Sequence, residues 1–187
     1  MTYEDVKTPI DLYRFMKENI KYGFFSSLDK KTHSRSEMNN DLLYEKLLFN
    51  TYSLQTPEEV LKRGYGICYD QVELERFFFE THGYDVKTYY TPYHNHAFLI
   101  YRDKNQYCIF ERSIKKLNGI YSENSLEEVL NYYKKMQLKD TNIDNIKFYE
   151  YQNVEFGCGI YDFIDLVTKE EKYGSKLKQK MKNYLNK

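Results

Sequence analysis

The stretch Arg63-Gly64-Tyr65-Gly66-Ile67-Cys68-Tyr69-Asp70 decides how the rest of the sequence is interpreted. Its two glycines permit a tight turn with little side-chain bulk. The largely apolar run from Val72 to Phe79 that follows is typical of a buried helix. We expect this helix to begin around Cys68 and to end at His82-Gly83, with Gly83 in the left-handed cap position. The sequence therefore predicts a cysteine at the start of a helix.

A cysteine at a helix start is suited to nucleophilic chemistry. The reactive species of a thiol is the thiolate, and an ordinary cysteine has a pKa of about 8.5. The positive end of a helix and a neighbouring imidazolium both favour the negative sulfur, and they bring the pKa of such thiols to roughly 3.5–7.5. A thiol nucleophile also needs a histidine within hydrogen-bond reach and a third group that orients the histidine. The backbone N–H of the nucleophile, here Cys68, is the first choice as a donor to an oxyanion.

The sequence that follows this helix has the period of β-strands. Three short segments alternate or are apolar, namely residues 86–90, 97–101 and 107–110. The last two are separated by residues 103–106, whose composition is that of a hairpin turn. We expect three consecutive antiparallel strands, and hence an α+β fold in which the helix carrying Cys68 packs on the sheet. His96 starts the second strand and Glu111 ends the third, so the hairpin brings them to nearly the same level.

Three motifs in this order resemble the transglutaminase-like superfamily, within the wider papain-like group of cysteine nucleophiles. They are Gly66-Ile67-Cys68, His96-Ala97-Phe98 and Tyr107-Cys108-Ile109-Phe110-Glu111. The resemblance covers residues 56–113 and includes the helix and the arginine-glycine pair before the cysteine. The sequence departs from the family pattern at Glu111, where the family usually has Asp, and at Phe98, where Trp is common.

The resemblance implies a transglutaminase-like core and a catalytic triad. Cys68 would attack a carbonyl to form a thioester, His96 would take and return the proton, and Glu111 would orient the imidazole. The implied substrate is a peptide or protein amide, with no metal and no cofactor. Hydrolysis, as in a protease or deamidase, is the default because water is the more abundant acceptor; an amine acceptor would give a transglutaminase. A non-catalytic binding module with the same fold is the alternative, and arylamine-type acyl transfer is a third class.

Other assignments of these residues stay open. His94 lies two residues from His96, on the same face of an ideal strand, and is an alternative base. The two histidines together with the thiols of Cys68 and Cys108 could bind zinc, although the usual paired spacing is missing. Glu111 could instead form a surface salt bridge with a neighbouring arginine. We expect Cys108 and Cys158 to be structural, because free cysteine is among the most buried residue types.

The first 55 residues are predicted to form an N-terminal helical part. We expect helices at about residues 8–22, capped by a threonine and a proline, and at residues 42–49. The polar segment 26–40 between them is predicted to be a loop, with a lid over a site as the alternative. Tyr44 and Tyr52 in this part are candidates for a side chain that helps to bind an oxyanion.

The regions flanking the hairpin are predicted mainly from capping residues. A short helix should run from Thr56 to Arg63, and another from Ser125 to about residue 136. A fourth strand is expected at residues 146–151, whereas residues 161–168 fit either a strand or a helix. A basic amphipathic helix at about 170–187 should pack one stripe on the domain, with an anionic partner or a membrane surface as the alternative. No linker or repeat divides the 187 residues, so a single domain is expected.

The composition excludes several classes of function. Lys plus Arg and Asp plus Glu both number 28, and this zero net charge argues against a nucleic-acid binder. No apolar run reaches about 18 residues, so no membrane span is expected. The N-terminus lacks a signal-peptide pattern, and three cysteines fit a reducing, cytoplasmic location. The oligomeric state and the particular substrate cannot be inferred from the sequence.

Overall fold

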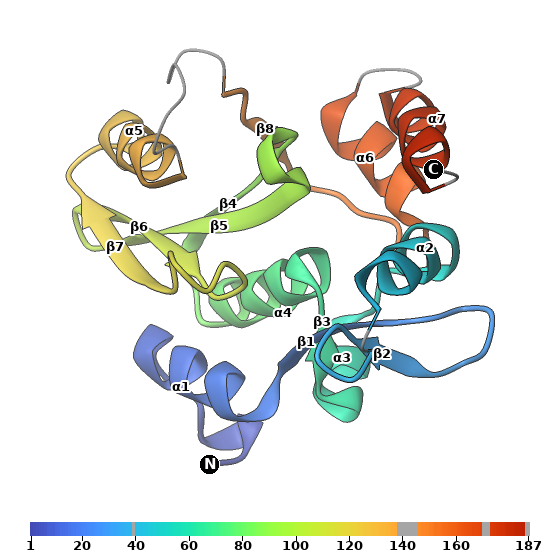
Figure 1. The fold of residues 1–187 in the computed structure, drawn as a ribbon. Coiled ribbons are helices and arrows are strands. Elements are labelled where there is room, and N and C mark those ends of the chain that lie inside the picture. The colour runs from blue at the N-terminus through green and yellow to red at the C-terminus, as the bar shows by residue number, and fades with distance from the viewer. Residues whose placement is uncertain (39, 138–145, 170–172, 186–187) are drawn as a thin grey trace.

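The computed structural model describes residues 1–38, 40–137, 146–169 and 173–185, and its fold is α+β (Figure 1). The largest sheet has five antiparallel strands in the order β7-β6-β5-β4-β8. These strands are β4 (Asp85–Thr91), β5 (His96–Asp103), β6 (Gln106–Glu111), β7 (Gly119–Glu123) and β8 (Tyr149–Tyr151). The three consecutive strands predicted from the sequence are confirmed. Strand β7 was not predicted, and β8 covers only the second half of the segment expected at 146–151.

The hairpin of β5 and β6 closes where the sequence placed its turn. Asp103 pairs with Gln106, and Lys104 between them has a positive φ of 53°. The ladder ends at the pair Leu99–Phe110. Extending this register by one residue sets Glu111 opposite Phe98, which lies two residues from His96. His96 and Glu111 are therefore diagonal neighbours at the end of the sheet, within reach of each other's side chains.

Helices cover both faces of this sheet (Figure 1). Helix α4 (Cys68–Thr81) packs on one face, where Leu99, Tyr101 and Phe110 join its core. Helix α5 (Leu126–Gln137) covers the other face, where the core contains Phe98, Ile100, Ile109 and Tyr133. Because neighbouring residues of a strand point to opposite faces, β5 and β6 contribute alternate side chains to the two cores. The predicted start of α4 at Cys68 and its end before Gly83 are confirmed.

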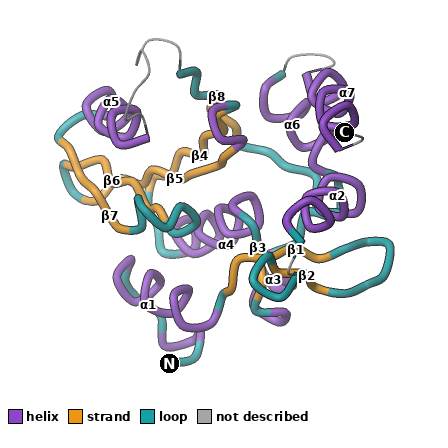
Figure 2. Tube along the Cα trace, viewed as in Figure 1, coloured by secondary structure: helices purple, strands orange, loops and turns teal. Residues whose placement is uncertain are grey.

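The N-terminal part contains a small sheet that was not predicted. Helix α1 (Pro9–Asn19) begins at the predicted Thr8 cap but ends earlier than expected, because Ile20 is extended (φ −113°, ψ 110°). The next residues form β1 (Lys21–Phe25), which pairs with β2 (Thr32–Ser34) and β3 (Tyr65–Gly66) in the order β2-β1-β3. The segment 26–40, predicted to be a loop, thus contributes a strand. Figure 2 shows these strands near the end of α4 that follows β3.

The remaining helices were largely predicted. Helix α2 is Asp41–Thr51, and α3 (Pro57–Arg63) has the expected Thr56–Glu59 capping box. The segment that fitted either a strand or a helix is α6 (Ile160–Thr168), and the basic tail forms α7 (Tyr173–Leu185). Within the described residues, none of these helices has the length and apolar character needed to cross a membrane.

Candidate active site

Cys68 is the first residue of α4 and is 4% exposed. The tight turn expected before Cys68 is present. Gly64 ends α3 with a φ of 68°, a conformation that favours glycine. The first N–H groups of a helix have no intrahelical acceptor. Ile67, the residue at the N-cap, has a hydrocarbon side chain and cannot accept from them. The backbone N–H of Cys68 is therefore available to a ligand beside the sulfur.

Asp70 holds the turn and the helix start together. Its carboxylate is completely buried and accepts three hydrogen bonds of 2.9 Å, from the Tyr52 hydroxyl, the Gln55 N–H and the Ile67 N–H. Burial raises the pKa of Asp70 to about 7, although these donors oppose the shift. The sequence suggested only an acid in the first turn of a helix. Asp70 instead fixes the backbone next to Cys68, and the bond to Tyr52 directs that hydroxyl away from an oxyanion role.

Gln71 links the same turn to the end of the hairpin. Its Nε2 donates to the Gly66 carbonyl at 2.7 Å, and its Oε1 accepts from the Ser113 hydroxyl at 3.3 Å. Gly66 lies so close to α4 that an added Cβ would stand 3.0 Å from Cβ of Asp70. The turn therefore packs tightly on α4 and is tied to the segment that follows Glu111.

His96 and Glu111 form a buried pair at the end of the sheet. Nε2 of His96 lies 2.9 Å from Oε2 of Glu111, and the two side chains are 5% and 1% exposed. The other carboxylate oxygen of Glu111 accepts from the N–H groups of Ser113 and Ile114, at 2.8 and 2.9 Å. The hydroxyl of Tyr133, on α5, also donates to Oε2. Four donors therefore fix a carboxylate that in turn fixes one nitrogen of the imidazole.

The electrostatics of the pair follow from these contacts. Burial lowers the pKa of His96, but the negative charge of Glu111 and hydrogen bonds to Cys68 and Glu111 outweigh it and raise the pKa to about 10. Burial likewise raises the pKa of Glu111, and the His96 charge with the hydrogen bonds from His96 and Tyr133 brings it below its ordinary value. The pair is therefore an imidazolium and a carboxylate at neutral pH.

The structure brings Cys68 to His96. An interaction with the Cys68 side chain is among the causes that raise the pKa of His96, and because Nε2 of the imidazole is held by Glu111, Nδ1 is the nitrogen left for the sulfur. His94, the alternative base, is exposed, has a φ of 62° and packs edge-on against Tyr93 instead. All three residues singled out in the sequence, Cys68, His96 and Glu111, thus meet where β5 begins and β6 ends.

Tyr22 is a site residue that the sequence did not indicate. Burial of its hydroxyl and then the charge of Cys68 raise the pKa of Tyr22 well above the usual range, and a side-chain interaction with Cys68 acts in the same direction. The residue as a whole is 47% exposed, so it lies between the buried thiol and solvent. The sequence placed Tyr22 at the end of a helix, which hid its position on a strand beside Gly66.

Glu75, two turns along α4 from Cys68, lies near the pair. It is 1% exposed, and its Oε2 has no hydrogen-bond partner among the described residues. Burial and then the charge of Glu111 raise the pKa of Glu75 well above its ordinary value. Burial and the neighbouring charge of Glu111 therefore both favour the neutral form of Glu75.

The other two cysteines lack such partners. Burial raises the pKa of both thiols, that of Cys158 to about 12. Cys108 lies within β6, and Tyr101 across the ladder is its hydrogen-bonding neighbour. In the parts of the chain that the structure describes, no three His, Cys, Asp or Glu residues are grouped so that they could hold a metal ion.

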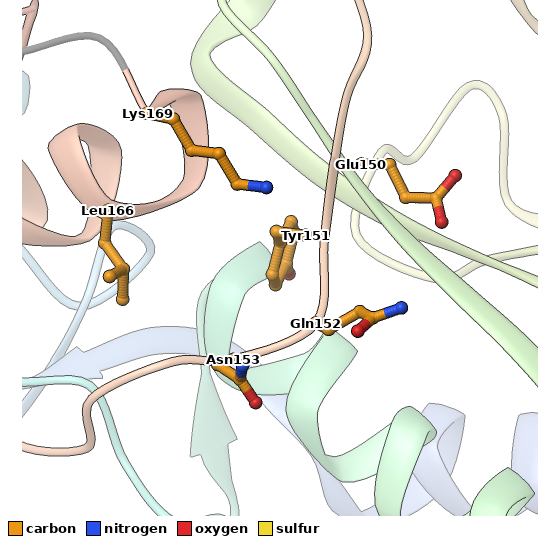
Figure 3. Close-up of a pocket in the computed structure, with 6 residues that line it drawn as sticks. All are labelled: Glu150, Tyr151, Gln152, Asn153, Leu166 and Lys169. Atoms are coloured by element: carbon orange, nitrogen blue, oxygen red, sulfur yellow. The ribbon is translucent and has the colours of Figure 1, made fainter.

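A separate pocket of about 550 Å³ lies beside β8, away from the triad. Its lining, shown in Figure 3, is Glu150, Tyr151, Gln152, Asn153, Leu166 and Lys169. Glu150 is already paired with Lys87 at 2.8 Å and accepts from the Tyr89 hydroxyl at 3.0 Å. None of Cys68, His96 and Glu111 contributes to this pocket.

The sequence matches no protein-family model, and comparisons with curated proteins and with solved structures found no match. The chemistry of the site therefore rests on the contacts described above.

Proposed function

We propose that this protein is a cysteine-nucleophile enzyme of the transglutaminase-like type, which hydrolyses a peptide or protein amide or transfers its acyl group. The observation that carries the proposal is the arrangement of three side chains. A cysteine at the start of α4 lies beside an imidazole whose pKa it helps to raise, and a buried carboxylate holds Nε2 of that imidazole at 2.9 Å. A nucleophile, a base and an orienting group in this relation are what thiol acyl transfer requires.

Each group has a defined task in the proposed reaction. The Cys68 sulfur attacks the carbonyl carbon, and the His96 imidazolium gives its proton to the leaving amine as the thioester forms. Water or an acceptor amine then attacks the thioester carbonyl and gives a proton to His96, the C–S bond breaks, and the thiolate and imidazolium are restored. Glu111 keeps Nδ1 directed at the sulfur and stabilises the imidazolium through its charge.

The experiment is to treat the native protein with limiting iodoacetamide near pH 6 and to map the labelled cysteines. We expect Cys68 to react far faster than Cys108 and Cys158, because of the three sulfurs it is the one beside the His96 imidazolium. The variant His96→Ala should slow labelling of Cys68 and leave Cys108 unchanged. Cys108→Ala is the matched control, and it should retain acyl-transfer activity that Cys68→Ala loses.

A non-catalytic binding module is the second candidate. The observation that favours it is the burial of Cys68, which is only 4% exposed. If Cys68 reacts only after denaturation, and His96→Ala does not change its rate, the triad is a structural remnant and this candidate replaces the enzyme.

A further inference from the structure

The N-terminal sheet brings a tyrosine hydroxyl to the nucleophile. Strand β1 pairs in parallel with β3, and Tyr22 stands opposite Gly66, two residues before Cys68. A further backbone bond, from the Lys21 N–H to the Gly64 carbonyl at 2.8 Å, fixes β1 against the turn. From this position the Tyr22 side chain lies beside Cys68, whose charge and side-chain interaction are among the causes that raise the pKa of Tyr22. A short strand pairing, rather than a flexible loop, therefore sets where this phenol lies.

A second phenol nearby has no partner for its hydroxyl. Tyr44, on α2, is 1% exposed, and its buried hydroxyl makes no hydrogen bond to any described residue. Its ring packs edge-on against Phe24 at 5.4 Å between centroids. Phe24 and Tyr22 are two residues apart on β1 and share one face of the strand. The charge of Cys68 is among those that act on Tyr44, and the charge of Tyr44 in turn acts on Tyr22, so the Tyr44 hydroxyl lies in the same neighbourhood.

An unpaired buried hydroxyl is uncommon in a folded protein and calls for a specific cause. An acceptor supplied by a ligand is such a cause, and the reaction proposed for Cys68 creates one beside the sulfur. When a thiolate attacks a carbonyl, the carbonyl oxygen becomes negative within a bond or two of the sulfur. Donors that surround the sulfur in the resting enzyme are therefore close to the position of this oxyanion.

We propose that the hydroxyls of Tyr22 and Tyr44, together with the backbone N–H of Cys68, bind the oxyanion of the acyl-transfer reaction. This inference rests on the proposed function. As the S–C bond forms, the π electrons of the carbonyl move to its oxygen, and the Tyr22 hydroxyl turns from the sulfur to that oxygen. As the C–N bond breaks, the C=O bond re-forms, and the leaving amine takes the proton of His96.

The protonation of the two phenols suits this role. Burial raises the pKa of Tyr44 to about 12, and it raises that of Tyr22 well above the ordinary value. Both hydroxyls therefore keep their protons over the neutral range and act as donors. Tyr52, the other upstream candidate, is committed to Asp70 at 2.9 Å.

The test uses two reagents that differ in one respect. Iodoacetamide alkylates a sulfur at a tetrahedral carbon and creates no oxyanion, whereas p-nitrophenyl acetate acylates it through one. Rates are measured on the high-pH plateau for the full chain and for Tyr22→Phe, Tyr44→Phe and the control Tyr132→Phe, whose ring lies on the exposed side of α5. We expect each of the first two variants to acylate about 10²–10³-fold more slowly while alkylation stays within about threefold. Tyr132→Phe should change neither rate.

Three outcomes would overturn the inference. The first two concern the phenols alone, whereas the third overturns the proposed function as well. If Tyr22→Phe and Tyr44→Phe acylate like the parent chain, the phenols do not bind the oxyanion. If acylation and alkylation fall together, the phenols act on the sulfur alone. If Cys68 of the parent chain is neither alkylated nor acylated, the proposed function itself fails. An added readout supports the assignment: Tyr44→Phe should unfold at a higher temperature, because it removes a buried hydroxyl without a partner.

Discussion

The site has two walls that differ in how the sequence specifies them. The hairpin wall consists of β5 and β6 and carries His96 and Glu111, which a local turn brings together. The N-terminal wall consists of β1, β3 and α2 and carries Tyr22 and Tyr44. Its position depends on a pairing of only two residues in β1 with two in β3, far apart in the chain. In the proposed reaction, local structure would therefore place the proton-transferring groups, and long-range structure the oxyanion donors.

The largest effect is expected in the hairpin wall, for Glu111→Gln. The carboxylate accepts from His96, Tyr133, Ser113 and Ile114, and an amide has one oxygen with which to serve both pairs of donors. The imidazolium also loses its counter-charge. We expect acylation by p-nitrophenyl acetate to fall by roughly 10²–10⁴-fold. Glu111→Asp keeps the charge and should fall less.

Tyr133→Phe is the matched control for that variant, because it removes one of the four donors and leaves the charge of Glu111 in place. Its loss should be about tenfold or smaller. Equal losses for Glu111→Gln and Tyr133→Phe would mean that packing, rather than the charge on Glu111, supports His96.

The sequence predicts the hairpin wall well for physical reasons. Residues 103–106 have the composition of a turn, and once the turn is placed the register of β5 and β6 follows by counting. No comparable signal exists for the N-terminal wall. Strand β1 continues directly from α1, and its partner β3 is two residues long, so neither has a detectable period. The burial of Asp70 was also hidden, since an acid in a first helical turn is usually exposed.

The second prediction concerns Asp70, which ties the turn before Cys68 to the residues that follow α2. In Asp70, one carboxylate oxygen accepts from Tyr52 and Gln55, and the other accepts from Ile67. Asp70→Asn replaces one of these two oxygens with an NH₂ group. Buried donors then face a donor, and we expect the free energy of unfolding to fall by about 2–4 kcal/mol in urea titrations. Asp11→Asn removes the same capping role at the exposed start of α1 and should have a much smaller effect. Similar losses would show that burial adds nothing at Asp70.

The third prediction concerns the dependence of stability on pH. The folded pKa of His96, about 10, exceeds its unfolded value of about 6.5. The stabilisation is therefore complete below about pH 6.5 and is lost as the pH rises towards 10, by on the order of 1 kcal/mol per pH unit. We expect the free energy of unfolding to fall over this range in the parent chain and to fall less in His96→Gln. Parallel curves would contradict an imidazolium at His96.

The smallest effect on stability is expected for Gly23→Ala in the N-terminal wall. This variant tests whether the position of β1 affects the reaction rates as well as the stability. An added Cβ at Gly23 would lie 2.6 Å from the His33 carbonyl oxygen and 2.9 Å from the Tyr65 ring, so Gly23→Ala must shift β1. The expected loss is about 1–3 kcal/mol. Gly83→Ala is the control, because a Cβ there meets nothing within 4 Å and only its φ of 78° is strained, which costs about 1–2 kcal/mol.

The two glycine variants should therefore have similar melting temperatures but different reactivity. Gly23→Ala moves the strand that carries Tyr22 and should slow acylation more than alkylation, whereas Gly83→Ala, at the far end of α4, should change neither rate. If Gly23→Ala leaves the ratio of the two rates unchanged, the N-terminal wall only covers Cys68, and the chemistry belongs to the hairpin wall alone. If the ratio falls, a strand pairing of two residues controls the reaction without contributing to the triad.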